Sequence, residues 1–291
     1  MSTETQAAPT ATAAKDVPAK PRFRIDQRYV APILVTCILL AGELTNRMLE
    51  SPWNTGLAIL TAIGLEIILG KLFTGKWPHL ASAYISGISV GILIRSPLVW
   101  PFALCSAISI LSKYVIRVKG RHIWNPSNFG VTMMLLLAHD YVASLSVQWD
   151  NRLWAMVPIW VLGSVIIARL KRFHICVAYV LSFLAFGALR TLVTHQPLFA
   201  EIAPLTGPMY QLYVFFMITD PKTTVSSKQG QIATVVCVAA VECAIRLAGS
   251  LYGFAWAVHA PYLALFIVGP IANLIEIYRG SGAAVQRVPA K

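Results

Sequence analysis

The chain has few charged residues. Asp, Glu, Lys and Arg make up 12% of its 291 residues, whereas hydrophobic residues make up 57%. Together with a mean hydropathy of +0.66, this composition excludes an ordinary soluble globular domain. Acidic residues are especially scarce, 12 against 24 Lys and Arg, so that the net charge is +12. The basic residues are spread through the loops and form no basic face, which argues against nucleic-acid binding.

Several motifs of soluble enzymes are also missing. The chain has no Walker motif, dinucleotide-binding glycine fingerprint, HExxH or GxSxG. None of the five cysteines is in a CxxC pair, and all fall in apolar segments, so we expect buried structural thiols without disulfides or a local metal site. They are Cys37, Cys105, Cys176, Cys237 and Cys243. No histidine is centred in an apolar segment, and we expect neither haem nor an iron–sulfur cluster.

What the chain does contain is a regular alternation of apolar stretches and short loops. A bilayer core of about 30 Å requires about 17–20 apolar residues of a helix. The sequence therefore predicts an all-α integral membrane protein with about ten transmembrane helices. The segments are residues 30–46, 55–73, 80–95, 98–114, 126–140, 153–169, 174–192, 205–219, 231–249 and 256–276.

The basic residues gather in alternate loops. With the N-terminus inside, 19 of the 24 Lys and Arg fall in inside segments and only five fall outside. The outside residues are Arg47, Arg95, Arg152, Arg190 and Arg246. This asymmetry follows the positive-inside rule and predicts a multi-pass protein of the bacterial cytoplasmic (inner) membrane with both termini cytoplasmic. Residues 1–28, which lack the apolar core of a signal peptide, are expected to form a disordered cytoplasmic arm, and residues 281–291 a cytoplasmic tail.

The membrane domain, residues 29–280, divides into two sets of five segments, about 29–145 and 150–280. The third segment of each set is short, carries small residues early and ends in a polar pair and a proline. Because five spans per set invert the second relative to the first, this similarity predicts two inverted repeats with short or broken third helices around a central site. Coincidence between two short helices stays open. Ala83, Gly87 and Gly91, four residues apart, favour close packing on another backbone over a ligand face.

Two polar clusters interrupt the apolar pattern. In the first, Lys113 and Arg117 lie one turn apart and are expected to extend from one face of the fourth helix. Asn125 is expected to cap the fifth helix, with Pro126 at its first position and Asn128 close behind. Cations beside a helix start are typical of an anion site, although membrane anchoring and an ordinary cap explain them as well.

The second cluster covers residues 219–230 and is rich in hydroxyl groups. Asp220 and Pro221 are expected to end the eighth helix near the membrane boundary. Lys222 could pair with Asp220 or meet a phosphate, and a serine at 226 or 227 could cap the ninth helix. The composition does not choose between a binding loop and a simple cap.

Ionisable residues within spans are functional candidates because burying their charge is costly. Glu242 has Arg246 one turn later, which favours a structural i,i+4 pair. Glu66 has no partner within four residues of the chain. We therefore consider Glu66 a candidate for a proton or cation pathway.

Four sequence motifs, taken in order, resemble the NqrB/RnfD family, which comprises the B subunit of the sodium-pumping NADH:quinone oxidoreductase and the D subunit of the Rnf electron-transport complex. They are RIDQRY, IWNPSNFGV, FMITDPKTTVSSKQGQ and GPIANLIE. The chain is most similar to the shorter UnbU-type branch, often found near enediyne biosynthesis genes, through ISGISVGILIRS, SKYVIRVKGRHIWNPSNFG and FFMITDPKTT. The resemblance covers residues 24–279.

The resemblance implies ten transmembrane helices in two inverted repeats, a flavin in the membrane domain, and electron transfer coupled to ion movement. Redox members of the family carry a Ser-Gly-Ala-Thr site between helices five and six, whose threonine is esterified to FMN, and a Gly-Glu-Thr-Ser element. Here that connection reads HDYVASLSVQWDN, and neither element is present. Covalent FMN is therefore not expected, whereas a non-covalent flavin, FMN or riboflavin, between the halves remains compatible with the sequence.

The leading hypothesis is a membrane protein for electron or ion transport that holds a non-covalent flavin and works in the lipid bilayer, with other membrane redox subunits as candidate partners. The residues expected to line or charge the site are Asn125, Asn128, Asp220, Lys222, Thr223, Thr224, Lys113 and Arg117. Two alternatives stay open: a non-redox transporter of a small solute on the same fold, and a scaffold for partner redox proteins. No catalytic side chain is assigned.

Overall fold

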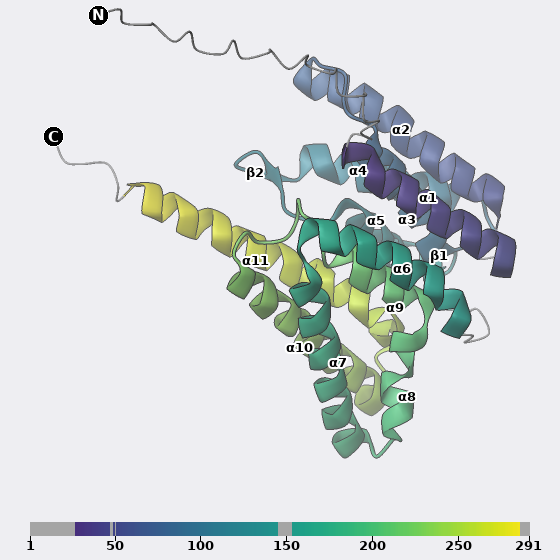
Figure 1. Cartoon of the computed structure of the whole chain (residues 1–291), viewed down its shortest axis with the longest axis vertical. Helices are drawn as coiled ribbons and strands as arrows, with labels where there is room; N and C mark the ends of the chain where they lie inside the picture. Colours follow the sequence, from purple (N-terminus) through teal and green to yellow (C-terminus); the bar gives the residue numbers. More distant parts are fainter. Residues whose placement is uncertain (1–26, 47–48, 50, 145–152, 286–291) are drawn as a thin grey trace, which may run out of the picture.

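The computed structural model describes residues 27–46, 49, 51–144 and 153–285 (Figure 1). The predicted arm lies outside the described residues, apart from the two that begin the first helix. The last helix continues to Val285, five residues beyond the predicted end of the membrane domain. The rest of the predicted tail lies outside the described part of the chain.

The first half contains five helices and short strands. The helices are α1 (Gln27–Asn46), α2 (Pro52–Thr74), α3 (Ala81–Leu93), α4 (Trp100–Val115) and α5 (Pro126–Leu137). The strands form two small antiparallel pairs, β1 (Ile94–Arg95) with β4 (Ala143–Ser144) and β2 (Arg117–Val118) with β3 (Arg121–His122). All five helices coincide with predicted segments, whereas the strands were not predicted.

The second half also contains five main helical segments, and the third of these is interrupted. Its elements are α6 (Leu153–Leu170), α7 (Phe173–Thr194), α8 (Leu198–Ile202), η1 (Ala203–Thr206), α9 (Pro208–Leu212), η2 (Tyr213–Met217), α10 (Lys228–Tyr252), η3 (Ala255–His259) and α11 (Ala260–Val285). The predicted segment 205–219, the third of its half, is broken, in agreement with the prediction of a short or broken third helix. Gly207 is extended in front of Pro208, as the residue before a proline prefers, and α9 then passes into the π-helical turn η2.

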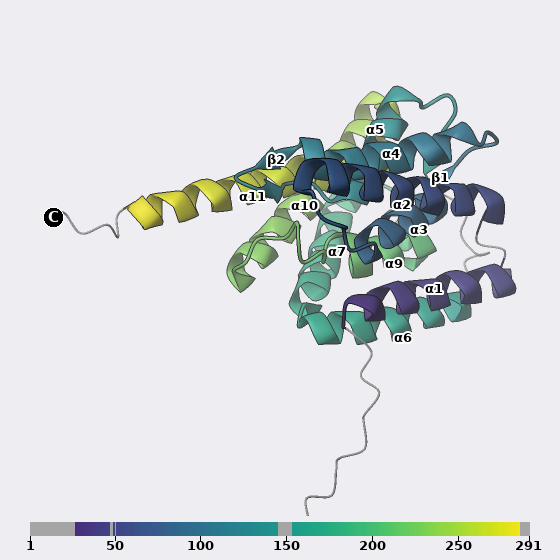
Figure 2. The same cartoon turned by 90° about the horizontal axis from the view of Figure 1, so that it is seen from above.

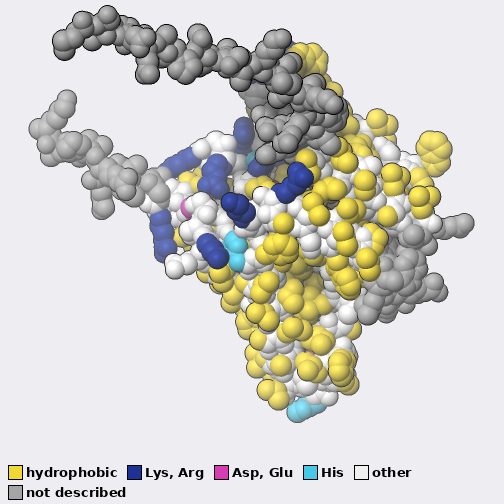
Figure 3. All heavy atoms as spheres, in the orientation of Figure 1, with side chains coloured by type: hydrophobic (Ala, Val, Ile, Leu, Met, Phe, Trp, Pro, Cys, Tyr) yellow, Lys and Arg dark blue, Asp and Glu magenta, His cyan; other side chains and the backbone are white. Residues whose placement is uncertain are grey.

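The molecule is an all-α membrane protein. Within the described residues, four helical stretches are long and apolar enough to cross a bilayer: Pro52–Thr74, Phe173–Thr194, Lys228–Tyr252 and Ala255–Arg279. Five further apolar helices are shorter, at 10–17 residues. Hydrophobic side chains cover the tapered lower part of the surface, whereas Lys and Arg gather on the side where β2 lies (Figure 3).

The helix pairings of the first half recur in the second. In the first half α1 packs on α3, α2 on α3 and α4, and α4 on α5. In the second half α6 packs on α9, α7 on η2 and α10, and α10 on α11. The halves meet where α1 lies beside α6 (Figure 2) and where α11 packs on α5. The α1–α6 contact thus joins the first helices of the two halves, and the α5–α11 contact joins their last.

Small residues bring α3 against α2, as the four-residue spacing predicts. A Cβ added to Gly87 would lie 2.6 Å from the backbone Cα of Ile59, and one added to Gly91 would lie 2.5 Å from Thr55. Ala83, on the same face, is fully buried. The expected close packing is therefore confirmed, and this face of α3 has no room for a ligand.

The prediction that all five cysteines are buried is wrong for two of them. Cys105, Cys176 and Cys243 are buried, but Cys37 on α1 and Cys237 on α10 are exposed. All five are free thiols. The reason for the error is that an apolar segment in a membrane protein has two apolar faces, one toward the core and one toward lipid, and composition does not distinguish them.

Replacing Gly87 by alanine should destabilise the protein, because the new methyl group meets backbone atoms that cannot move aside. We expect a loss of about 1–3 kcal/mol, seen as a lower melting temperature of the detergent-solubilised protein. Gly64→Ala in α2 is the matched control, since a Cβ there meets nothing within 4 Å and alanine favours the helix. Equal melting temperatures for the two variants would contradict the packing described for α3.

Candidate functional site

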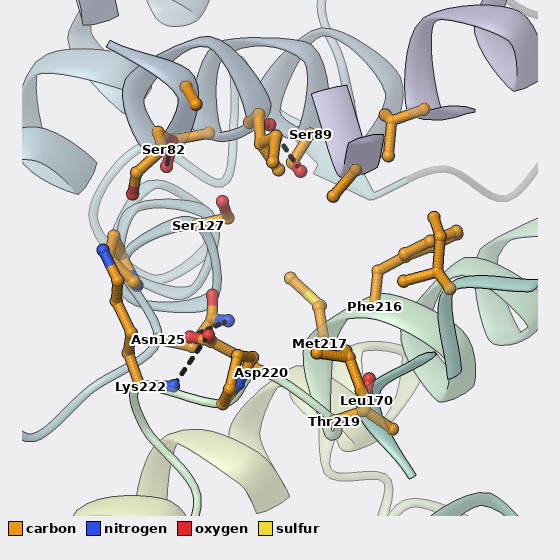
Figure 4. A pocket seen from close by; sticks show the side chains of 18 of the residues that line it. Ser82, Ser89, Asn125, Ser127, Leu170, Phe216, Met217, Thr219, Asp220 and Lys222 are labelled. Carbon is orange, nitrogen blue, oxygen red and sulfur yellow. Dashed lines mark hydrogen bonds between the residues drawn. The ribbon is translucent and has the colours of Figure 1, made fainter. Parts of the chain in front are cut away.

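A cavity of about 580 Å³ lies between the two halves of the membrane domain (Figure 4). Residues of α1 and α3 and the start of α5 line it from the first half. The end of α6, η2 and the loop after η2 line it from the second half. The volume lies within the range of about 300–1,000 Å³ typical of small-molecule sites.

The cavity has an apolar interior and a polar, exposed end. Ile85, Ile166, Phe215, Phe216 and Met217 contribute apolar surface. Ser82, Ser86 and Ser89 form a row on one face of α3, with Ser127 of α5 nearby (Figure 4). His79, Arg169 and Lys222, which are exposed, line the charged end, near the start of α3. The arrangement suits an amphiphilic ligand with one charged end.

The two polar clusters found in the sequence meet at this cavity. The Asn125 Nδ2 donates a hydrogen bond to the Asp220 Oδ2 at 3.2 Å, across 95 residues of chain. Asp220 also accepts from the Thr223 hydroxyl at 2.8 Å and from the backbone N–H of Lys222 at 3.1 Å. Three donors thus hold the Asp220 carboxylate in one orientation. Folding therefore brings the two clusters into contact, and neither cluster predicts this contact from its own sequence.

The start of α5 forms as the Asn-Pro-Ser-Asn unit predicts. The Asn125 Oδ1 accepts from the Asn128 backbone N–H at 3.0 Å, and Pro126 stands at the first turn. Asn128 is buried and donates to the Tyr262 carbonyl of α11 at 3.3 Å. The predicted cap of α10 is also confirmed, since the Ser227 hydroxyl accepts from the Gly230 N–H. The caps place Asn125 at the cavity and Asn128 behind it.

Not all expected site residues reach the cavity. Asn125, Asp220 and Lys222 line it. The Thr223 hydroxyl instead donates to the Asp220 carboxylate, and the Thr224 hydroxyl donates to the Asp220 backbone carbonyl. Both threonines therefore shape the loop that presents Asp220 and Lys222. Neither threonine lines the cavity. The Lys222 ammonium forms no ion pair with another described residue, although its backbone N–H binds Asp220.

Lys113 and Arg117 do not share a helix face as predicted. α4 ends at Val115, and Arg117 lies exposed on β2. Lys113 is buried and pairs with Glu66 of α2, with 2.5 Å between Nζ and Oε2. The expectation fails because the helix ends between the two residues.

Glu66 has two partners from α4. Besides Lys113, the Tyr114 hydroxyl donates to its Oε1 at 3.0 Å. Lys113 also donates to the Ser82 hydroxyl at 3.4 Å, and Ser82 lines the cavity. The missing local partner that suggested an ion pathway is thus supplied by a distant segment, and the pathway role of Glu66 stays a prediction.

A second buried carboxylate lies in the other half. Glu242 pairs with Arg246 at 3.0 Å, as the i,i+4 spacing predicts. It also accepts from the Tyr179 hydroxyl at 2.5 Å and from the Tyr210 hydroxyl. The two tyrosines belong to α7 and α9, so this cluster ties three helices together, but none of its members lines the cavity.

Two polar residues of α11 support the site and were missed in the sequence. The Asn273 amide, 1% exposed, donates to the backbone carbonyls of Ile123 and Thr223, one from each polar cluster. Glu276 accepts from Arg121 at 3.0 Å and from the Ser226 N–H at 2.5 Å. An asparagine within a predicted apolar span was the signal that could have identified the first of them.

His122 lies on β3, outside the long helices, and lines the cavity. Burial lowers the pKa of His122 below its ordinary value of 6.5. Lys222, Lys113 and Arg117 lower this pKa further, and Asp220 opposes them. The imidazole is therefore neutral at pH 7, and charging it would place another cation in a region already rich in cations.

Comparison of the chain with protein-family models gives no match, and comparison with curated proteins gives none either. The described residues contain no group of three or more His, Cys, Asp and Glu arranged to hold a metal ion. The cavity and the residues around it are therefore the basis for assigning a function.

Replacing Lys113 by methionine should destabilise the protein by about 3 kcal/mol, because Glu66 is left buried without its cation. The double variant Lys113→Met/Glu66→Gln should recover part of this loss, since no buried charge then remains. The measurement is the melting temperature in detergent, with Asp140→Asn as control, since the His139–Asp140 pair is exposed. A double variant that is less stable than both single variants would contradict this account of the pair.

The stability of the protein should fall on acidification below about pH 6.5. The unfolded chain takes up a proton at His122 near pH 6.5, whereas the folded protein, in which the pKa is lower, does not. The stability that arises from this difference in the pKa of His122 is therefore present above pH 6.5, and it is lost as the pH falls toward the pKa of His122 in the folded protein. Melting temperatures of the wild type and His122→Gln from pH 7.5 to 5 test this, and parallel curves for the two proteins would contradict it.

Proposed function

We propose that this protein is a multi-pass inner-membrane protein of NqrB/RnfD type, which binds a flavin non-covalently and takes part in membrane electron transport coupled to ion movement. The observation that carries the proposal is the cavity in which Asn125 and Asp220 meet. Two of the four motifs that resemble this family, IWNPSNFGV and FMITDPKTTVSSKQGQ, contribute residues to the lining of that cavity.

The residues of the cavity fit a flavin. A flavin has a flat, largely apolar ring system with hydrogen-bonding atoms along one edge and a polar side chain. The volume of about 580 Å³ accommodates such a molecule, and Phe215, Phe216 and Met217 offer an apolar wall for the ring. Ser86, Ser89 and Ser127 offer hydroxyl oxygens within the same space.

The side chains of the chain itself would bind and orient the flavin. Asn125 and Asp220, fixed by their mutual hydrogen bond, provide a rigid polar edge. The hydroxyls of Ser86 and Ser89 donate to backbone carbonyls one turn earlier, so their lone pairs remain able to accept from the ligand. A bound flavin supplies the electron-transfer chemistry, and the protein tunes its potential through these contacts.

The ten-helix inverted repeat is part of the proposal. Helices α1–α5 pack on one another in a pattern that recurs among α6, α7, α9–η2, α10 and α11, and this recurrence supports the repeat. The excess of Lys and Arg in alternate loops supports cytoplasmic termini, because ten spans, an even number, leave both ends of the chain on the side that carries the positive charge. The short α3 and the broken α9–η2 segment line or flank the cavity from opposite halves, as in transporters with inverted repeats.

That last observation also favours a second candidate, a transporter of a small amphiphilic solute. The cavity lies beside the α1–α6 contact, where a relative movement of the two halves would open it. Solute flux into proteoliposomes without an electron donor would distinguish transport from electron transfer.

The purified protein should carry flavin that acid precipitation releases into the supernatant. We expect the absorption bands of a flavin before precipitation and none in the pellet, because the chain lacks the covalent attachment site. Flavin that remains in the pellet would contradict the non-covalent assignment, and a colourless folded protein that takes up neither riboflavin nor FMN would contradict the proposal as a whole.

Replacing Asn125 or Asp220 by alanine should lower the flavin content several-fold. Loss of either side chain removes the bond that joins the two polar clusters and leaves the other without its partner. Asp140→Asn, an exposed change away from the cavity, is the control. Variants that insert and melt like the wild type but keep full flavin content would place the flavin elsewhere.

A further inference from the structure

The charged end of the cavity has more positive than negative charge. Arg169 at the end of α6 and Lys222 after η2 line it, and Asp220 is the one carboxylate among the lining residues. Arg172, two residues after α6, interacts electrostatically with Asp220 from outside the lining. A single carboxylate thus faces several cations.

This carboxylate does not neutralise the lining cations by direct contact. Its hydrogen-bond partners are the Asn125 amide, the Thr223 hydroxyl and a backbone N–H, all of them uncharged donors. Among the described residues, neither the Arg169 guanidinium nor the Lys222 ammonium forms an ion pair. Both cations therefore keep donors free for an anion.

Two helix starts face the same space. Ala81 and Ser82 of α3 line the cavity. The residue before them, Leu80, offers no side-chain cap, and the His79 Nδ1 accepts from the Ala81 N–H at 3.4 Å. Pro126 and Ser127 begin α5 on the same lining. Because helix N-termini carry partial positive charge, both starts add to the field of Arg169 and Lys222.

We infer that this end of the cavity is a phosphate subsite, in which Arg169 and Lys222 hold the phosphate of an amphiphilic ligand whose apolar body lies against Phe215, Phe216 and Met217. Arg and Lys from different elements suit a phosphate, since both make charge-assisted hydrogen bonds to its oxygens. If the proposed function holds, on which this step rests, the ligand is FMN rather than riboflavin.

The test compares FMN with riboflavin, which differ only in the phosphate. Endogenous flavin is first removed from the purified full-length protein without acid, and the protein is placed in nanodiscs of uncharged lipid. Binding of each flavin is then measured through the quenching of its fluorescence. The variants are Arg169→Gln, Lys222→Gln and the double variant. The matched control is Lys228→Gln, which removes an exposed lysine of the same region that does not line the cavity.

The wild type should bind FMN at least about tenfold more tightly than riboflavin, as one or two charge-assisted hydrogen bonds imply. Each single variant should reduce this preference, and the double variant should abolish it while leaving riboflavin affinity within about twofold. Lys228→Gln should keep the preference. Equal affinities of the wild type for both flavins, or an unchanged preference in the double variant, overturn the phosphate subsite but leave the proposed flavin function standing.

A second arm decides the case in which neither flavin binds, which would overturn the proposed function. A pyrene-labelled alkyl phosphate and the corresponding alcohol are then compared on the same variants. Preference for the phosphate that depends on Arg169 and Lys222 supports the subsite; no preference overturns it. Competition by inorganic phosphate or by phosphatidic acid in the nanodisc shows whether a free anion or a lipid headgroup is the better source of the phosphate.

Discussion

The hydrogen bond between Asn125 and Asp220 is the contact on which the cavity depends. It joins the start of α5 in the first half to the residue that follows η2 in the second. Both groups would be costly to leave unpaired at the edge of an apolar interior. Asn273 adds a second connection by donating to Ile123 and Thr223, one residue from each cluster. The two clusters are therefore held together from α11 as well, and the cavity has a rigid polar edge.

Away from the cavity, each half is braced by its own buried ion pair. Glu66 and Lys113 join α2 to α4, and Glu242, Arg246 and Tyr179 join α10 to α7. These are equivalent helix pairs in the two halves. In a dry interior the loss of one partner costs more than the pair itself contributes. The Glu66–Lys113 pair and the Tyr179–Glu242 hydrogen bond therefore make the register of these helices hard to change.

The local predictions succeeded where neighbouring residues determine the structure. The cap at Asn125, the cap at Ser227 and the close approach of Gly87 all follow from a few adjacent side chains. Arg117 shows the limit of that reasoning. It was predicted to share a helix face with Lys113, but α4 ends at Val115, between the two residues. Cys37 and Cys237 show another limit, since an apolar helix does not reveal which of its faces meets lipid.

The sequence by itself determined that the protein is helical and belongs in a membrane, because long apolar stretches have few other stable states once water is absent. It also determined the starts of α5 and α10 and identified Asn125, Asp220 and Lys222 as candidates. Only the tertiary structure decided that these residues meet at one cavity, that Arg169 joins them, and that Glu66 finds Lys113 47 residues away. Those contacts depend on how whole helices pack, and pairings between distant segments leave no local pattern in the chain.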